Sequence, residues 1–328
     1  MADERGRRFE AQLLGCECAP DPVAVAERLL AVQAQDLRSA RLAVRARTSG
    51  LAASDVDRCL DERGLVVGWL NRGTLQLVRP EDYWWLHALT TPPLFTGNAR
   101  RLAQTGVTAA AAERGVEAIV RALDGGPKTR DELGAVVAAR RVPTAGQALV
   151  HVLMLACLRG LALRGPFVNG RHAYVLARDW IGPPPPLDRD AALGELARRY
   201  LAGHAPADEH DLARWAGLPL RDARAGLLRA AEVTGAPPPA RPRPCLLDQW
   251  DPVLVGWRSR EALLELYPRR EDAMAHYRPF AWVGGRVVAT WGFRDGTVTV
   301  EAPFVGLPAA AEKALRAEAA DVERFLTS

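Results

Sequence analysis

Two glutamines, one residue apart, are the side chains in this sequence that stand out as candidates for chemistry. Gln33 and Gln35 flank Ala34 at the end of an apolar helical pattern, and Asp36 follows them. A glutamine amide does not titrate, so neither residue is a general acid or base; its carbonyl oxygen accepts hydrogen bonds and its NH₂ group donates them. The pair is therefore either a site built on neutral amides or a helix end whose amides cap backbone groups.

Familiar catalytic and metal-binding patterns are missing from the sequence. It has no G-x-S-x-G, P-loop, H-x-x-x-H or G-x-G-x-x-G, which argues against the standard hydrolase, NTPase and dehydrogenase classes. The five cysteines and six histidines are scattered, without the four matched ligands of a zinc site. We therefore expect neither a metal nor a cofactor. Asp248 and Asp251 form either a hydrogen-bonded corner or a site.

The composition describes a mildly basic chain of 328 residues, with a formal charge of +4 and an isoelectric point of about 9.0. Only Lys128 and Lys313 are lysines, so arginine supplies almost all of the positive charge. This reflects either a GC-rich genome or a surface that faces phosphate. The N-terminus lacks a signal-peptide pattern, and the most apolar run, residues 148–158, is too short to span a membrane. We expect a cytoplasmic protein that makes no membrane contact.

Groups of helices followed by two short strands recur along the chain. In the first group, residues 21–33 are predicted to be helical, and strands at 65–70 and 74–79 are joined by a tight turn at Asn71-Arg72-Gly73. The second group ends in a hairpin at 161–176, and one of its helices starts with a Thr-x-x-Glu capping box. The third has a helix-turn-helix signature and then a Pro-rich connector instead of a hairpin.

This order predicts a mainly α fold with β: three tandem winged-helix modules forming a concave body, plus a C-terminal β-barrel-like part. Alternating strands and a closing helix indicate that last part. The expected boundaries are 1–95 for the first winged helix with the glutamine motif, 96–182 for the second, 183–240 for the third module, and 241–328 for the β-rich part.

Three stretches of this chain resemble the winged-helix DNA glycosylases of the AlkZ type. They are "LAVQAQDLRSARLAVRAR", "WLNRGTLQLVRPEDYWWL" and "LLDQWDPVLVGWRSR", in the same order and spacing, and the resemblance covers nearly the whole chain. It implies three tandem winged helices, a β-barrel and the release of alkylated bases. The Gln-x-Gln form implies the branch that acts on bulky N7-guanine adducts and crosslinks. One departure is Gln76, where family members often have histidine.

The resemblance also implies a role for the two amides. Alkylation at N7 makes guanine a cationic leaving group that needs no general acid, so what remains is to hold a water under C1′ and stabilise an oxocarbenium-like sugar. We expect Gln35 to hold that water and Gln33 to be its partner. DNA contacts are expected from the set Arg38, Arg41, Arg72, Thr74 and Gln76, with Asp36 and Asp251 in support.

The sequence thus favours a monomeric, monofunctional DNA glycosylase acting on double-stranded DNA with alkylated guanine. No lysine lies near the motif, so a Schiff-base lyase step is not expected. The alternatives are a non-catalytic winged-helix DNA-binding regulator and a protein-interaction scaffold. Some of the arginines that follow the motif, Arg38, Arg41, Arg45 and Arg47, should touch phosphate; the face that Arg41 and Arg45 share could instead pack against acidic neighbours.

Overall fold

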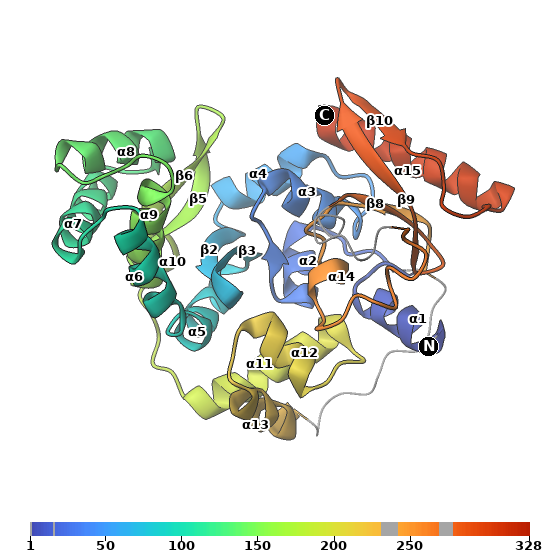
Figure 1. Ribbon diagram of the computed structural model, residues 1–328, viewed down its shortest axis with the longest axis horizontal. Helices are drawn as coiled ribbons and strands as arrows, with labels where there is room; N and C mark the ends of the chain where they lie inside the picture. The colour runs from blue at the N-terminus through green and yellow to red at the C-terminus, as the bar shows by residue number, and fades with distance from the viewer. Residues whose placement is uncertain (1, 16, 231–241, 269–277) are drawn as a thin grey trace. The chain divides into compact units, whose positions relative to one another are not determined.

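The computed structural model shows a mixed α/β chain with two compact units (Figure 1). The structure describes residues 2–15, 17–230, 242–268 and 278–328. One unit combines residues 1–56 with 193–328, and the other is residues 57–192. This division is coarser than the four parts expected from the sequence, which stay a prediction.

Two hairpins form most of the sheet in the 57–192 unit, and the short strand β4 (Lys128–Thr129) pairs with the second of them. Strands β2 (Val66–Leu70) and β3 (Thr74–Val78) are joined by a 3₁₀ turn over Asn71–Gly73, and β5 (Ala162–Val168) pairs with β6 (Arg171–Leu176). Arg72 and Gly73 have φ of +57° and +77°, so the predicted tight turn is confirmed. The sequence assigned the hairpins to separate modules, but β2 and β5 pair directly, so both hairpins share one sheet.

Helices complete this unit. The predicted capping box is confirmed, because Thr129 Oγ1 accepts a hydrogen bond from the backbone N–H of Glu132 while the Glu132 carboxylate accepts one from that of Thr129. Helix α9 is buried as expected and packs against α6 and α7. The remaining elements are α5 (Pro80–Thr90), α6 (Leu94–Gln104), α7 (Ala109–Asp124), β4 (Lys128–Thr129), α8 (Arg130–Ala139), α9 (Ala148–Leu158) and α10 (Ala177–Ile181), while α4 (Ala53–Asp61) crosses the unit boundary.

The other unit joins the two ends of the chain. Its helix-turn-helix is confirmed: Asp208 caps α12, and Gly217, with φ of +74°, ends it. Its elements are α1 (Ala2–Ala11), α2 (Pro22–Leu29), β1 (Val32–Gln33), α3 (Leu37–Arg45), α11 (Arg189–His204), α12 (Glu209–Ala216), α13 (Leu220–Ala230), β7 (Cys245–Leu247), α14 (Pro252–Val255), β8 (Phe280–Val283), β9 (Arg286–Arg294), β10 (Thr297–Val300) and α15 (Ala309–Thr327). The expected Pro-rich connector, as far as position 241, falls outside the described residues.

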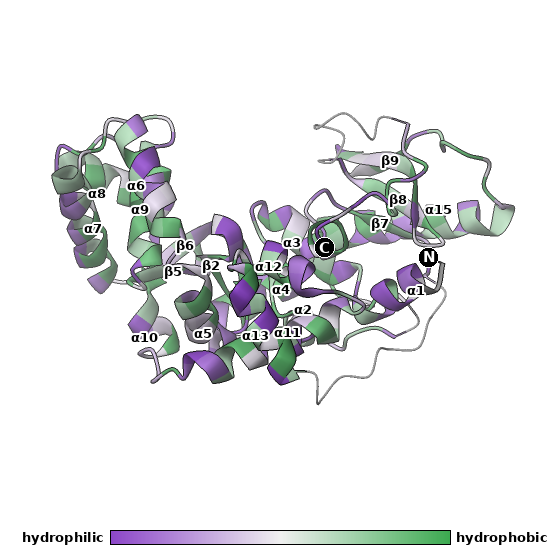
Figure 2. Cartoon of the chain, turned by 60° about the horizontal axis from the view of Figure 1, so that its bottom comes forward, coloured by the Kyte–Doolittle hydropathy of each residue, from purple (hydrophilic) through white to green (hydrophobic). Residues whose placement is uncertain are grey.

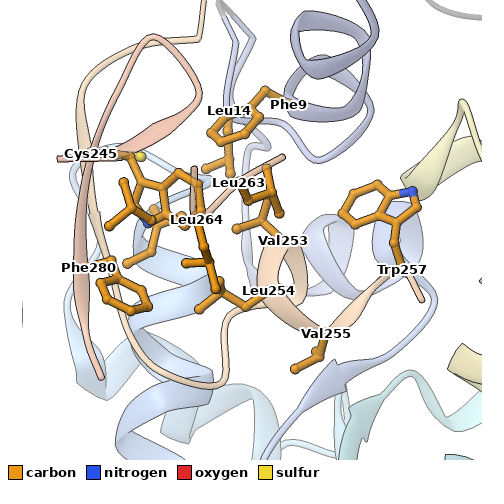
Figure 3. Close-up of a cluster of buried hydrophobic side chains, with 14 of the residues drawn as sticks. Phe9, Leu14, Cys245, Val253, Leu254, Val255, Trp257, Leu263, Leu264 and Phe280 are labelled. Atoms are coloured by element: carbon orange, nitrogen blue, oxygen red, sulfur yellow. The ribbon is translucent and has the colours of Figure 1, made fainter. Parts of the chain in front are cut away.

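The C-terminal strands are antiparallel in the order β10-β9-β8-β7, and α15 packs against β7 and β10. Their apolar face belongs to a core that also contains Phe9 and Leu14 from the N-terminus (Figure 3). Val253, Leu254 and Trp257 lie in the same core, so residues 245–257 are firmly held against the start of the chain.

One local prediction was wrong. The helix expected over residues 21–33 ends at Leu29, and Leu30 has φ of +65°, a left-handed conformation that breaks the helix. The chain then extends into β1, so Gln33 lies in a two-residue strand rather than at a helix end.

Most helices carry both hydrophilic and hydrophobic residues along their length, as Figure 2 shows by colour. In the part of the chain that the structure describes, no helix combines the length and apolar character needed to cross a membrane.

Candidate functional site

The two glutamines of the motif differ in their access to solvent. Gln33, in β1, is only 4% exposed, whereas Gln35 lies in the short exposed link between β1 and α3. A molecule in solution can therefore reach Gln35 directly, whereas Gln33 is covered by the protein. This arrangement fits the expected division into a main residue and a supporting one.

Asp36 fixes the start of α3 immediately after Gln35. Its Oδ1 accepts a hydrogen bond from the backbone N–H of Arg38 at 3.1 Å, which makes Asp36 the N-cap of the helix. The cap fixes the backbone at Asp36, the residue that follows Gln35 directly.

The arginines after the motif separate into two kinds. Arg45 and Arg47 are buried: Arg45 forms ion pairs with Glu318 and Asp321, and Arg47 pairs with Asp251. These two arginines stabilise the fold and are too buried to be among those that touch phosphate, and for Arg45 the alternative of packing against acidic neighbours is confirmed. Arg38 and Arg41 are partly exposed on α3.

Asp251 forms the hydrogen-bonded corner that was one of the two alternatives. Its carboxylate is fully buried and accepts hydrogen bonds from both Nη atoms of Arg47, at 2.9 Å and 2.8 Å. Its Oδ1 also accepts one from the backbone N–H of Val253 and caps α14. In the contacts described, Asp251 therefore stabilises the fold of residues 245–257 through Arg47 and the cap of α14.

Asp248 is a residue whose place the sequence did not reveal. It is 1% exposed and its Oδ2 accepts a hydrogen bond from the hydroxyl of Ser39 at 2.8 Å. Arg38 Nη2 lies 3.9 Å from the same oxygen. Burial is the largest effect on the Asp248 carboxyl and raises its pKa, against the hydrogen bonds from Gln249 and Ser39. The D-x-x-D spacing indicated either a corner or a site, but it did not show which of the two carboxylates contacts α3.

The remaining expected contacts lie in the 57–192 unit. Arg72 and Thr74 are partly exposed, whereas Gln76 is buried and donates through Nε2 to Thr74 Oγ1 at 2.6 Å. Thr74 in turn donates to the backbone carbonyl of Asn71 at 2.9 Å. The Gln76 amide therefore stabilises the hairpin turn, and Arg72 and Thr74 lie partly exposed on that turn.

Metal ligands do not gather in the residues described, since the structure there has no group of three or more His, Cys, Asp or Glu side chains placed to hold an ion.

Comparison with known proteins gives one consistent result. The model of a family described as "DNA glycosylase AlkZ-like" matches residues 26–325. A protein of Streptomyces sahachiroi named "Interstrand DNA cross-link repair glycosylase" is 29% identical, over 97% of this chain and 94% of that protein. The solved structure of Streptomyces sahachiroi DNA glycosylase AlkZ superposes with a TM-score of 0.78 and 25% identity, covering 99% of this chain and 96% of that one.

Proposed function

Because the chain belongs to the AlkZ-like family of DNA glycosylases, we propose that it releases bulky N7-alkylguanine adducts from duplex DNA by hydrolysing their N-glycosidic bonds. The relative from Streptomyces sahachiroi is named for interstrand cross-link repair, which supports including crosslinks joined through guanine N7 among the substrates. These relatives favour the enzyme over the alternative of a DNA-binding regulator without catalytic activity.

The proposed reaction needs little from the protein in the way of acid or base. N7-alkylguanine is already cationic, so when the C1′–N9 bond breaks, its electron pair neutralises the departing base. A water then bonds to C1′ of the oxocarbenium-like sugar and loses a proton to solvent. Gln35 accepts a hydrogen bond from this water and so orients it, while the buried Gln33 supports the arrangement.

The observation that carries this assignment is the exposure of Gln35 on a link held at both sides. Strand β1 ends two residues before Gln35, and the Asp36 cap follows directly. A backbone fixed on both sides limits the positions that the Gln35 side chain can take, and preorganisation of a polar group favours stabilising a transition state over merely binding a ground state.

Binding to the duplex would use the partly exposed Arg38, Arg41, Arg72 and Thr74, with Gln76 ordering Thr74 from behind. Arginine forks suit phosphate oxygens in two-point geometry. We also propose that the chain contains three winged-helix modules and that it acts as a monomer in the cytoplasm. The proposed reaction has no Schiff-base step, because the only lysines are Lys128 and Lys313, both remote in sequence from the motif.

A duplex with a single N7-alkylguanine tests the proposal directly. With excess enzyme, wild-type protein should release the base and leave an abasic site without cutting the strand. Gln147→Ala is the matched control for the Gln35→Ala variant, because Gln147 is an exposed amide at the start of α9 whose side chain forms no cap. Binding of the duplex without base release by wild-type protein would instead support the regulator.

A further inference from the structure

A buried carboxylate from the C-terminal part of the chain is hydrogen-bonded to the helix that follows the glutamine motif. Asp248 Oδ2 accepts from Ser39 Oγ at 2.8 Å, and its Oδ1 accepts from the backbone N–H of Gln249 at 2.8 Å. Ser39 is itself buried, lies in the first turn of α3, and is four residues after Gln35. The contact joins residues 209 apart in sequence.

The Ser39 hydroxyl lies between two carboxylates. Its oxygen is 2.8 Å from Asp248 Oδ2 and 3.4 Å from Asp36 Oδ2. A hydroxyl has one proton to donate, and the shorter distance assigns that proton to Asp248. Asp36 uses its other oxygen to cap α3. The two carboxylates therefore fix the same helical turn, one from outside and one from the protein interior.

An uncharged side chain could fill the space that Asp248 occupies, so packing alone does not explain its negative charge. A carboxylate that is 1% exposed is costly to bury unless it is compensated. Among the described residues, Asp248 has an ion-pair contact with Arg38, at the long distance of 3.9 Å, and Arg38 is itself partly exposed. Asp251, three residues later, shows the contrasting case of a carboxylate fully paired with a buried arginine.

We propose that Asp248 is a positioning residue for catalysis: through Ser39 it holds the first turn of α3, and with it the Gln35 amide, in the orientation needed to place water. This inference rests on the proposed role of Gln35. A hydrogen bond to an ionised acceptor is about twice as strong as one to a neutral acceptor, so the charged carboxylate holds Ser39 more firmly than an amide of the same shape.

The test is a double-mutant cycle of Ser39→Ala and Asp248→Asn. Three quantities are measured for each protein: the single-turnover rate of N7-alkylguanine release, the dissociation constant for undamaged duplex, and the melting temperature. Each single variant should release the base roughly tenfold more slowly with nearly unchanged duplex binding. The double variant should be no slower than the slower single one, because both changes break the same link.

The pH profile separates positioning from a structural role. The charged groups that face the Asp248 carboxyl are Arg38 and Asp36, both on or next to α3. Burial raises the Asp248 pKa, so the wild-type rate should fall as acidic pH protonates it. The Asp248→Asn protein lacks this group and should lose that acid limb. Asp295→Asn, in an exposed turn with φ of +51°, is the control for removing a carboxylate charge.

The outcomes are distinguishable. Wild-type rates in both single variants, additive effects in the double variant, or a loss explained entirely by unfolding would overturn the positioning role. If Asp248→Asn does not fold, an unchanged rate in Ser39→Ala is sufficient to overturn it. Full activity in Gln35→Ala would instead refute the role of Gln35 on which the inference depends, and a lack of base release by wild-type protein would refute the proposed function itself.

Discussion

The Arg47–Asp251 pair allows a quantitative prediction about which carboxylate of the 248–251 corner supports the fold. Arg47 is fully buried and uses all five N–H groups. They reach both oxygens of Asp251, the backbone carbonyls of Gln12 and Ala43, and Oε1 of Gln12. Asp251→Ala removes two of these acceptors and the only anion paired with the guanidinium in the contacts described.

The expected loss of stability is large because a buried charge is left unpaired. Breaking such a pair from one side costs about 3–5 kcal/mol. Part of this loss should be recovered in the double variant Arg47→Met/Asp251→Leu, which removes both charges and keeps apolar volume in the site. Urea unfolding followed by tryptophan fluorescence measures the free energy, with Asp295→Asn as the surface control.

Two results would refute this account of Asp251. One is a free-energy loss for Asp251→Ala below about 1 kcal/mol, the range of an exposed ion pair. The other is a stable Asp251→Ala protein that has lost base release, which would place this carboxylate in the catalytic site. The folded fraction of the variant should retain the wild-type rate.

Two further predictions concern charge and pH. Arg38→Ala and Arg72→Ala should each lower the salt dependence of duplex binding by about one unit if each contacts one phosphate, and an unchanged slope in a fluorescence-anisotropy titration would remove that residue from the interface. His204 is buried and stacked on Tyr200, and burial lowers its pKa to about 3. Since the unfolded histidine takes up a proton near pH 6.5 and the folded one does not, stability should be greatest above that pH and should fall by about 2 kcal/mol between pH 7 and pH 5. His204→Phe should show a flatter profile in urea unfolding over this range, and an equally steep one would assign the pH dependence to other groups.

Features encoded by neighbouring residues were predictable from the sequence. The turn at Asn71-Arg72-Gly73 and the Thr129–Glu132 capping box each depend on a few adjacent side chains, and both are present. The end of α2 was not predictable in the same way. The apolar spacing continues past Leu29, but Leu30 adopts a positive φ that its side chain does not signal.

Contacts between distant residues were beyond the reach of sequence patterns. Nothing in the spacing of Asp248 and Asp251 shows that the first meets Ser39 and the second meets Arg47, because these contacts arise only when the C-terminal strands pack on the N-terminal core. The same limit applies to Arg45, whose place on α3 resembles that of Arg41 but which is covered by α15 acids. The motif located the candidate site in the sequence, whereas tertiary packing determines which of the nearby side chains are accessible.

The central claim is that Gln35 orients water in the transition state, and the Gln35→Ala variant tests it most directly. The measurement is the single-turnover rate of N7-alkylguanine release, taken with the duplex dissociation constant and melting temperature of the same sample. The rate should be lower by roughly a hundredfold, equivalent to about 3 kcal/mol, with binding and stability nearly unchanged. A lower melting temperature with an unchanged rate per folded molecule would contradict it and show that the glutamine only stabilises the start of α3.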